Sequence, residues 1–146
     1  MAPARILLIE DNPTDVRLLL YALQEQRAWP TELVVVDDGE KAIHYLIEQN
    51  SSANGANLDL VILDLNLPKL NGTEVLQTIR TTPGLQSVPV IVLTSSPEEV
   101  SAGIVRQANL EADCYMTKPV NVDDFLAVGG LLRRICEGNK ITRLTL

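Results

Sequence analysis

The chain has 146 residues, of which 46% are hydrophobic and 21% are charged, and its formal net charge is −7 at pH 7. This length and composition predict one globular domain and exclude both a disordered chain and two ordinary domains. The negative charge argues against direct binding to nucleic acid, and the short apolar runs exclude a membrane span.

The hydrophobic pattern alternates between short apolar runs, typical of buried strands, and helical periodicity. In chain order, the expected elements are a strand at 5–10, a helix at 12–26, a strand at 32–36, a helix at 38–49, a strand at 58–64, a helix at 72–81, a strand at 88–94, a helix at 97–111, a strand at 113–117 and a helix from about 121 onward. Pro13 and Asp15 stand where proline and acidic residues are common, in the first turn of a helix.

Each of the first two predicted helices carries an apolar stripe with helical spacing. The stripe positions are Val16, Leu19, Leu20 and Leu23 in the first helix, and Ala42, Ile43, Leu46 and Ile47 in the second. The only histidine of the chain, His44, follows Ala42 and Ile43, and we expect it at the surface or at the boundary of the core, without a chemical role.

Strand and helix alternate five times, which predicts an α/β fold with a parallel sheet and helices on both of its faces. In such sheets, ligands bind beyond the carboxyl ends of the strands, near the point where the strand order reverses. Four strands end on polar residues that can carry chemistry, namely Glu10, Asp11, Asp64, Thr94 and Lys118. We therefore expect a functional site at this edge of the sheet, which we call the rim.

The rim is expected to hold a divalent metal ion. Glu10, Asp11 and Asp64 would raise one another's pKa unless a cation compensates their charge. Their hard oxygen ligands suit Mg²⁺, with Mn²⁺ as the second candidate. Lys118 and Thr94 would add an ammonium and a hydroxyl, and this set of groups supports phosphoryl transfer. Asp64, at the end of the middle strand, is the candidate nucleophile.

Each of these residues also has an ordinary explanation. Asp11 or Asn12 would be a suitable N-cap for the helix that begins at Pro13. A lysine before a proline is often a solvated turn residue, and a threonine at a strand end reflects the preference of β-branched residues for strands. The functional hypothesis depends on the convergence of several strand ends and not on any one residue.

Four segments carry a resemblance to a known family: "LLIEDNPTD", "LVILDLNLPKLNG", "VPVIVLTSS" and "CYMTKPV". Together they closely resemble the receiver domain of bacterial two-component response regulators, from about Arg5 to Arg134. The resemblance implies a flavodoxin-like, doubly wound sheet of five parallel strands in the order 2-1-3-4-5. It also implies a receiver domain at 1–136, followed by a C-terminal extension at 137–146 that is too short for an effector domain.

The resemblance assigns roles to the acidic residues. Asp64 would accept a phosphoryl group from the phosphohistidine of a partner. Asp11 would bind Mg²⁺ directly, Glu10 mostly through water, and Asn66 through its backbone carbonyl, with Asp64 completing the metal site.

It also assigns roles to the groups around them. Lys118 would pair with the phosphoryl group, and the Lys118–Pro119 peptide bond is expected to be cis, which a prolyl bond tolerates at low cost. Thr94 would be the switch hydroxyl that moves toward the phosphoryl group. Tyr115 would be the aromatic residue that turns inward when Thr94 moves.

The segments "EDNPTDVRLLLYAL" and "VVVDDGEKAIHYL" resemble the stand-alone regulators that serve cyanobacterial phytochrome kinases. The implied partner is a sensor histidine kinase, with a phytochrome as the specific candidate. A homodimer is expected through the fourth and fifth helices, extended by the C-terminal tail. No signal peptide opens the sequence, so the expected location is cytoplasmic. The protein would then be a phosphoacceptor that assists its own phosphotransfer and dephosphorylation, and not an enzyme.

Three other functions compete with this hypothesis. An aspartyl-phosphate hydrolase usually needs a second aspartate two residues after its nucleophile, where this chain has Asn66, which cannot donate a proton in that way. A flavodoxin-like cofactor carrier needs a first loop that cradles phosphate, whereas "EDNPTD" would repel it. A receiver-like interaction module that takes no phosphoryl group stays open as well. So does the meaning of Gly129–Gly130 in the last helix, which indicates either close packing against the sheet or a partner, or a weakened helix.

Overall fold

The computed structural model describes residues 3–51, 58–95 and 112–138. Its elements are β1 (Ala4–Ile9), α1 (Pro13–Gln24), β2 (Thr31–Val36), α2 (Gly39–Asn50), β3 (Leu60–Leu63), α3 (Gly72–Thr81), β4 (Val90–Thr94), β5 (Cys114–Thr117) and α6 (Val122–Cys136). The helix expected at 97–111 and the tail beyond Gly138 lie outside the described residues.

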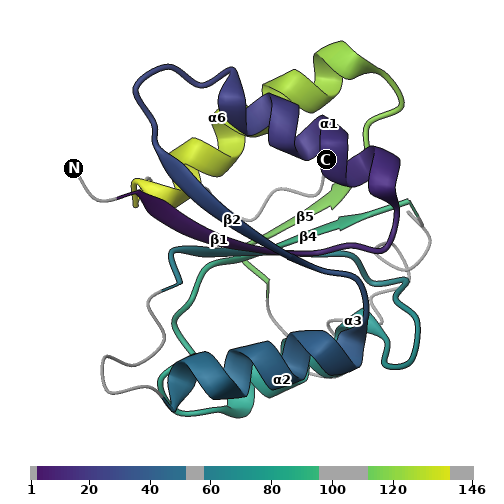
Figure 1. Cartoon of the computed structure of the whole chain (residues 1–146), viewed down its shortest axis with the longest axis vertical. Coiled ribbons are helices and arrows are strands. Elements are labelled where there is room, and N and C mark those ends of the chain that lie inside the picture. The colour runs from purple at the N-terminus through teal and green to yellow at the C-terminus, as the bar shows by residue number, and fades with distance from the viewer. Residues whose placement is uncertain (1–2, 52–57, 96–111, 139–146) are drawn as a thin grey trace.

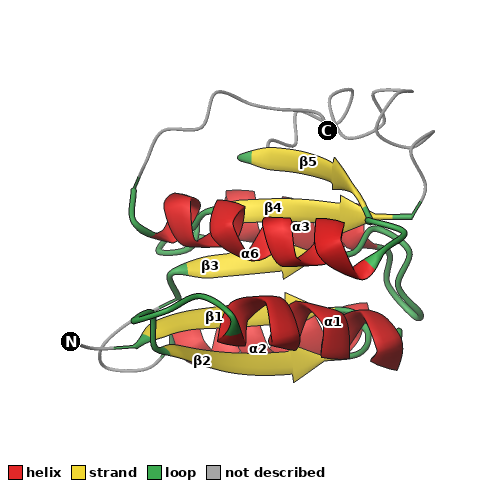
Figure 2. Cartoon of the chain, turned by 90° about the horizontal axis from the view of Figure 1, so that it is seen from above, coloured by secondary structure: helices red, strands yellow, loops and turns green. Residues whose placement is uncertain are grey.

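The sheet has five strands in the order β2-β1-β3-β4-β5, and every neighbouring pair is parallel. Figure 2 shows all the strand arrows pointing the same way. The predicted strand order and the predicted strand directions are confirmed. The central strand is β3, with β1 on one side and β4 on the other. Ile9 of β1 pairs with Leu63 of β3, so the residues that follow them lie at the same edge of the sheet.

Two strands, β3 and β4, begin two residues later than the sequence pattern predicts, because side chains and turns take up their first residues. Before β3, the backbone N–H of Asp59 donates to the carbonyl of Arg5, and its carboxylate accepts the N–H of Arg5 at 2.8 Å. Before β4, Val88 closes a turn onto Leu85, and Pro89 has no N–H to give to a strand ladder.

The sheet separates two hydrophobic cores. Figure 1 shows α1 and α6 on one face of the sheet and α2 and α3 on the other. Alternate strand residues point to opposite faces: in β1, Leu7 and Ile9 face α2 and α3, whereas Ile6 and Leu8 face α1 and α6. All four of these side chains are at most 1% exposed, which explains why the strand reads as a continuous apolar run.

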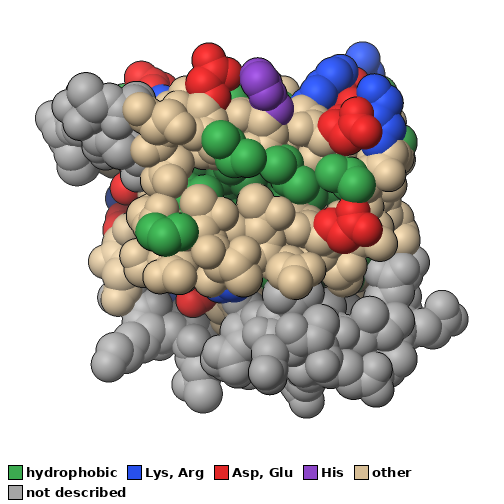
Figure 3. All heavy atoms as spheres, turned by 90° about the horizontal axis from the view of Figure 1, so that it is seen from below, with side chains coloured by type: hydrophobic (Ala, Val, Ile, Leu, Met, Phe, Trp, Pro, Cys, Tyr) green, Lys and Arg blue, Asp and Glu red, His purple; other side chains and the backbone are tan. Residues whose placement is uncertain are grey.

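The predicted helix stripes are only partly buried. Leu19, Leu23, Ala42 and Leu46 are buried, but Leu20 is 40% exposed and Ile47 is 50% exposed, so these two stripe positions lie at the surface. The sheet covers only one side of each helix, and the apolar stripe of the helix is wider than the strip that the sheet covers. Figure 3 shows the face of α2 and α3, where a strip of hydrophobic side chains lies at the surface.

His44 lies on the outside of α2, where its imidazole is 3.5 Å from Glu48 and its side chain is 83% exposed. The prediction of a surface or boundary histidine is confirmed. None of the helices in the described part of the chain is long and apolar enough to cross a membrane.

The four described helices all begin at the rim, because each follows the carboxyl end of a strand. Each begins after a side-chain cap: Asn12, Asp38, Asn71 and Asn121. The cap oxygen accepts the N–H three residues further on, at 3.3, 2.8, 3.1 and 2.9 Å respectively. These caps satisfy N–H groups that the helix leaves unpaired, and they direct the positive ends of four helix dipoles toward the rim.

Candidate functional site

Two buried carboxylates stand at the centre of the rim. Glu10 follows β1 and is 2% exposed, and Asp64 follows β3 and is 4% exposed. The sheet ladder continues through both residues, because Glu10 N–H donates to the Val36 carbonyl and Asp64 N–H donates to the Ile9 carbonyl, each at 3.0 Å. The backbone of both acids is therefore fixed by the sheet and not by a loop.

Asp11 completes an acidic cluster with these two residues. Each carboxylate of Glu10, Asp11 and Asp64 offers an oxygen, and these oxygens lie within 4.8 Å of one another. Asp11 is exposed to solvent, whereas the other two are buried. An all-oxygen donor set of this size and charge fits a divalent cation such as Mg²⁺.

Backbone N–H groups support the two buried acids in the same way. The N–H of Asn12 donates to Glu10 Oε1, and the N–H of Asn66 donates to Asp64 Oδ1, each at 3.0 Å. In both cases the donor is two residues beyond the carboxylate, as in an Asx-type turn. One oxygen of each carboxylate is thereby held in place.

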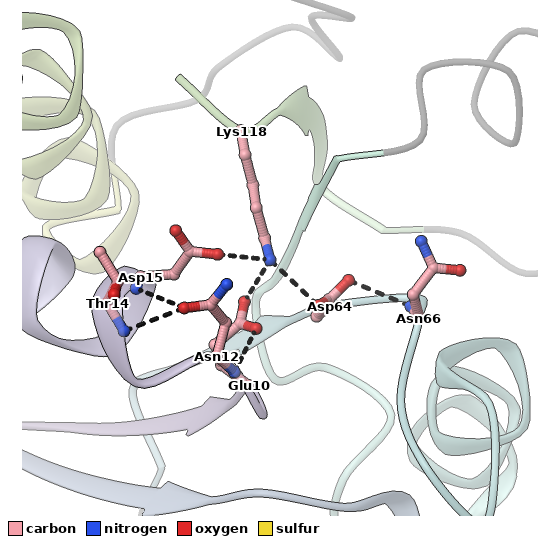
Figure 4. A network of polar contacts seen from close by, with 7 residues as sticks. All are labelled: Glu10, Asn12, Thr14, Asp15, Asp64, Asn66 and Lys118. Carbon is pink, nitrogen blue, oxygen red and sulfur yellow. Dashed lines mark hydrogen bonds and ion pairs between the residues drawn. The ribbon is translucent and has the colours of Figure 1, made fainter. Parts of the chain in front are cut away.

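The other oxygens meet the side chain of Lys118, which reaches across the rim from the segment after β5 (Figure 4). Its Nζ lies 2.8 Å from Glu10 Oε2 and 3.1 Å from Asp64 Oδ2. Burial alone lowers the pKa of Lys118, but its hydrogen bonds to Asp15 and Glu10 and the charge of Asp64 outweigh burial and raise it. Lys118 is therefore a permanent positive charge beside Asp64.

One lysine does not neutralise this cluster. Burial, together with the negative charge of Asp64, raises the pKa of Glu10 from an ordinary value of 4.5 to about 7, although the contacts with Lys118 and the Asn12 N–H act in the opposite direction. The rim thus carries excess negative charge, which either a proton on Glu10 or a bound cation can compensate.

Asp15 is a member of the site that sequence reasoning placed only in a first helical turn. Its Oδ2 lies 2.8 Å from Lys118 Nζ, and Figure 4 shows it on the α1 side of the lysine. A signal for this contact existed, because a helix that follows a strand end begins at the rim and directs its first-turn side chains there. Residue type and spacing did not reveal that the Lys118 side chain would extend toward it.

Thr94 and Tyr115 lie on neighbouring strands near the rim. Thr94 ends β4 and is fully buried, and its carbonyl accepts the N–H of Lys118 at 2.7 Å. Tyr115 is 7% exposed, belongs to the core on the side of α2 and α3, and its hydroxyl accepts the N–H of Ala112 at 2.9 Å. The tyrosine side chain is thus buried in this structure.

The expected cis bond is absent. Among the described residues, which include both Lys118 and Pro119, the structure contains no cis peptide bond, so this prediction is wrong. The trans form is the one that X–Pro bonds favour, by about 0.5–1 kcal/mol. With a trans bond, the long Lys118 side chain already reaches the acidic cluster, so no isomerisation is needed to form these contacts.

The segment after Asp64 returns close to it at Gly72, the first residue of α3. A methyl group on Gly72 would come within 2.5 Å of the Asp64 carbonyl oxygen, which is a contact that real side chains do not make. Gly72 N–H donates to the Leu65 carbonyl at 2.9 Å. The close approach therefore requires glycine, and it sets the position of α3 against the candidate nucleophile.

The structure does not need Asp11 as a cap, and it does not leave Lys118 in solvent. The cap of α1 is Asn12, whose side chain accepts from Thr14 N–H, so Asp11 is not needed for capping. Lys118 is not a solvated turn residue, since its side chain is only 10% exposed. The four strand ends converge as predicted.

Comparison with known proteins points the same way. The family model of the response regulator receiver domain matches residues 6–128. Response regulator Rcp1 of Synechocystis is 38% identical over 130 residues, covering 88% of this chain and 86% of that protein. The crystal structure of the phosphorylated cyanobacterial phytochrome response regulator RcpA has a TM-score of 0.81 and 36% identity, covering 96% of this chain and 98% of that one. The Mn²⁺-bound form of Rcp1 has a TM-score of 0.75 and 36% identity, covering 90% of this chain and 93% of that one.

Proposed function

The chain belongs to the response regulator receiver domain family, whose members take part in two-component signalling, and on that premise we propose that Asp64 is its phosphoacceptor. The observation that carries this proposal is the pairing of Asp64 with Lys118 at 3.1 Å, inside a cluster of carboxylates at the carboxyl ends of the central strands. A nucleophile and a fixed positive charge at this distance are what phosphoryl transfer to a carboxylate requires.

The reaction is the transfer of a phosphoryl group from a phosphohistidine to Asp64. A carboxylate oxygen of Asp64 attacks phosphorus, the P–N bond to the imidazole breaks, and the departing nitrogen takes up a proton. The ammonium of Lys118 stabilises the negative charge on the phosphoryl oxygens. The partner that supplies the group is a histidine kinase, as the receiver family implies.

Receiver domains bind a divalent metal ion, and here we assign Mg²⁺, with Mn²⁺ as a substitute. Asp11 and Asp64 would hold it directly, Glu10 mostly through water, and Asn66 through its backbone carbonyl. When bound, the ion supplies positive charge that offsets the carboxylates and the incoming phosphoryl oxygens. The fit rests on the three converging carboxylates of the acidic cluster.

Phosphorylation would act as a conformational switch through Thr94 and Tyr115. The Thr94 hydroxyl would move toward the phosphoryl group, and Tyr115, which packs on the neighbouring strand, would respond. Both residues lie where β4 and β5 meet, since Val92 pairs with Tyr115 and Thr94 with Thr117. The signal would pass to partner proteins through the face made by the helix expected at 97–111, β5 and α6.

Several finer assignments follow from the likeness to phytochrome response regulators. The kinase would be a phytochrome, and the location cytoplasmic. The receiver domain would extend over 1–136, with a C-terminal extension at 137–146. A homodimer would form through the helix expected at 97–111, α6 and this extension. The helix expected at 97–111 and the residues beyond 138 lie outside the described part of the chain.

Intact-mass spectrometry after incubation with a small phosphodonor tests the proposal. We expect a gain of one phosphoryl group that requires Mg²⁺ and disappears in Asp64→Asn. The matched control is Asp59→Asn, which changes an aspartate at the other end of the same strand and should leave the uptake intact. Labelling that persists in Asp64→Asn would overturn the assignment of the phosphoacceptor.

A further inference from the structure

The ammonium of Lys118 is shared by three carboxylates from three different segments of the chain. Its Nζ lies 2.8 Å from Glu10 Oε2, 2.8 Å from Asp15 Oδ2 and 3.1 Å from Asp64 Oδ2. A lysine ammonium has three N–H donors, so these contacts use all of them. The lysine is therefore held from three sides (Figure 4).

Asp15 differs from the other two carboxylates because it is not one of the candidate metal ligands. Glu10 and Asp64 belong to the acidic cluster, whereas Asp15 does not. A divalent cation in that cluster competes with Lys118 for the negative charge of Glu10 and Asp64. Of the three contacts of Lys118, the one with Asp15 is then the least disturbed.

The Asp15 carboxylate is also not needed to cap its own helix. The side chain of Asn12 already accepts the N–H groups of Thr14 and Asp15, at 2.9 and 3.3 Å. Asp124 is the equivalent third residue of α6, and its carboxylate accepts a hydrogen bond from Asn121, inside its own first turn, at 2.9 Å. Asp15 instead reaches a lysine that is 103 residues away in sequence.

We propose that Asp15 is a positioning residue that anchors Lys118 Nζ beside Asp64 when a divalent cation binds the acidic cluster. Without this anchor, Lys118 has only Glu10 and Asp64 as partners, so it competes more strongly with the cation for them. The metal affinity then falls, although Asp15 is not a metal ligand. In phosphoryl transfer, a role that rests on the proposed function, the anchor keeps the ammonium available to the phosphoryl oxygens.

The test is a calorimetric titration of Mn²⁺ into Asp15→Ala and Asp15→Asn. Both substitutions remove the charge equally, but the Asn carbonyl can still accept a hydrogen bond from Lys118. We expect Asp15→Ala to bind Mn²⁺ about fivefold more weakly than Asp15→Asn, the order of magnitude of one ordinary hydrogen bond. Equal affinities of the two variants would contradict the anchor, because only the shared loss of charge would then matter.

The same pair of substitutions is repeated in Lys118→Met. If Asp15 acts through Lys118, the difference between Ala and Asn disappears in this background. A difference that persists there would overturn the proposal, since it would have to arise through another contact. Asp124→Ala and Asp124→Asn are the controls for the loss of a first-turn acid, and they should bind Mn²⁺ like the unaltered chain.

Phosphoryl uptake from a small donor provides the second readout. We expect Asp15→Ala to take up the group more slowly than Asp15→Asn at saturating Mn²⁺. Equal rates would contradict the role of the anchor in transfer. If the unaltered chain takes up no phosphoryl group, the proposed function fails, whereas the Mn²⁺ titrations still decide whether Asp15 anchors Lys118.

Discussion

Gly129 of α6 lies directly against the backbone of Ala22 in α1. A methyl group at Gly129 would be 2.5 Å from the Ala22 carbonyl oxygen, whereas one at Gly130 would have only the side-chain nitrogen of Gln26 near it, at 3.8 Å. Gly129 therefore allows close packing, but against α1 of the same chain and not against the sheet or a partner, which were the neighbours considered from the sequence. Gly130 weakens the helix without a packing reason in the described structure.

This difference predicts opposite effects of the same substitution at adjacent positions. Gly129→Ala should lower the free energy of unfolding by about 1–3 kcal/mol, because the two helix backbones must move apart. Gly130→Ala should raise it by about 0.5–1 kcal/mol through helix propensity. Urea denaturation of both variants measures this, and equal effects would contradict the packing described here.

The hydroxyl of Tyr115 provides a buried acceptor for the N–H of Ala112. Tyr115→Phe keeps the ring but leaves that N–H without this partner, so we expect a loss of about 1 kcal/mol in the free energy of unfolding. Tyr21→Phe is the control, since Tyr21 is 47% exposed and should change little. Thermal unfolding of the two variants should separate them, and equal Tm values would speak against the buried hydrogen bond.

Asp113 joins the beginnings of two strands to α3. Its Oδ2 accepts the N–H of Val90 at 2.7 Å and Nη2 of Arg80 at 3.1 Å. Asp113→Ala removes both bonds and should lower the free energy of unfolding by about 1–2 kcal/mol. Asp113→Asn keeps an acceptor and should lose clearly less. The two variants are compared by chemical denaturation, and an equal loss would show that charge alone matters.

The raised pKa of Glu10 predicts a pH dependence of the metal-free protein. The pKa is about 7 in the folded state against an ordinary value of 4.5, so between these pH values the folded state binds a proton that the unfolded chain has lost. The free energy of unfolding should therefore contain a contribution that is fully present below pH 4.5 and is lost as the pH rises to about 7. Denaturation curves across this range, with a chelator present, measure it.

Glu10→Gln is the control for this titration, because it cannot lose a proton. Its free energy of unfolding should lack the decline that the unaltered chain shows over the same range. Parallel pH profiles for the two proteins would rule out a raised pKa at Glu10. Because metal ligands must be deprotonated, binding of Mg²⁺ should release a proton below about pH 7 in the unaltered chain.

The order of the strands and the convergence of Glu10, Asp64, Thr94 and Lys118 could be predicted from the sequence. The prediction works because parallel strands put their carboxyl ends on one edge, so the position of a residue at a strand end also gives its position in space. The start of α3 at Gly72 was predictable from a local signal, since the cap residue Asn71 directly precedes it.

Other features depend on tertiary contacts that no local pattern contains. The contact of Asp15 with Lys118 depends on the direction of a long side chain. The exposure of Leu20 and Ile47 depends on how much of each helix the sheet covers, and not on the helix itself. The trans bond before Pro119 is a choice between two isomers that lie within about 1 kcal/mol of each other, so residue identity does not decide it.

The unequal exposure of the acidic cluster has a kinetic consequence. Asp11 faces solvent, whereas Glu10 and Asp64 are covered. A hydrated cation that approaches from outside meets Asp11 first, while most of its water shell is still in place, and passes inward from there. Arrival and departure of the ion then require only the stepwise exchange of water for carboxylate oxygens, without opening of the sheet or either core. The exchange rate of the ion should accordingly follow the dehydration rate of the metal chosen and not the unfolding rate of the protein.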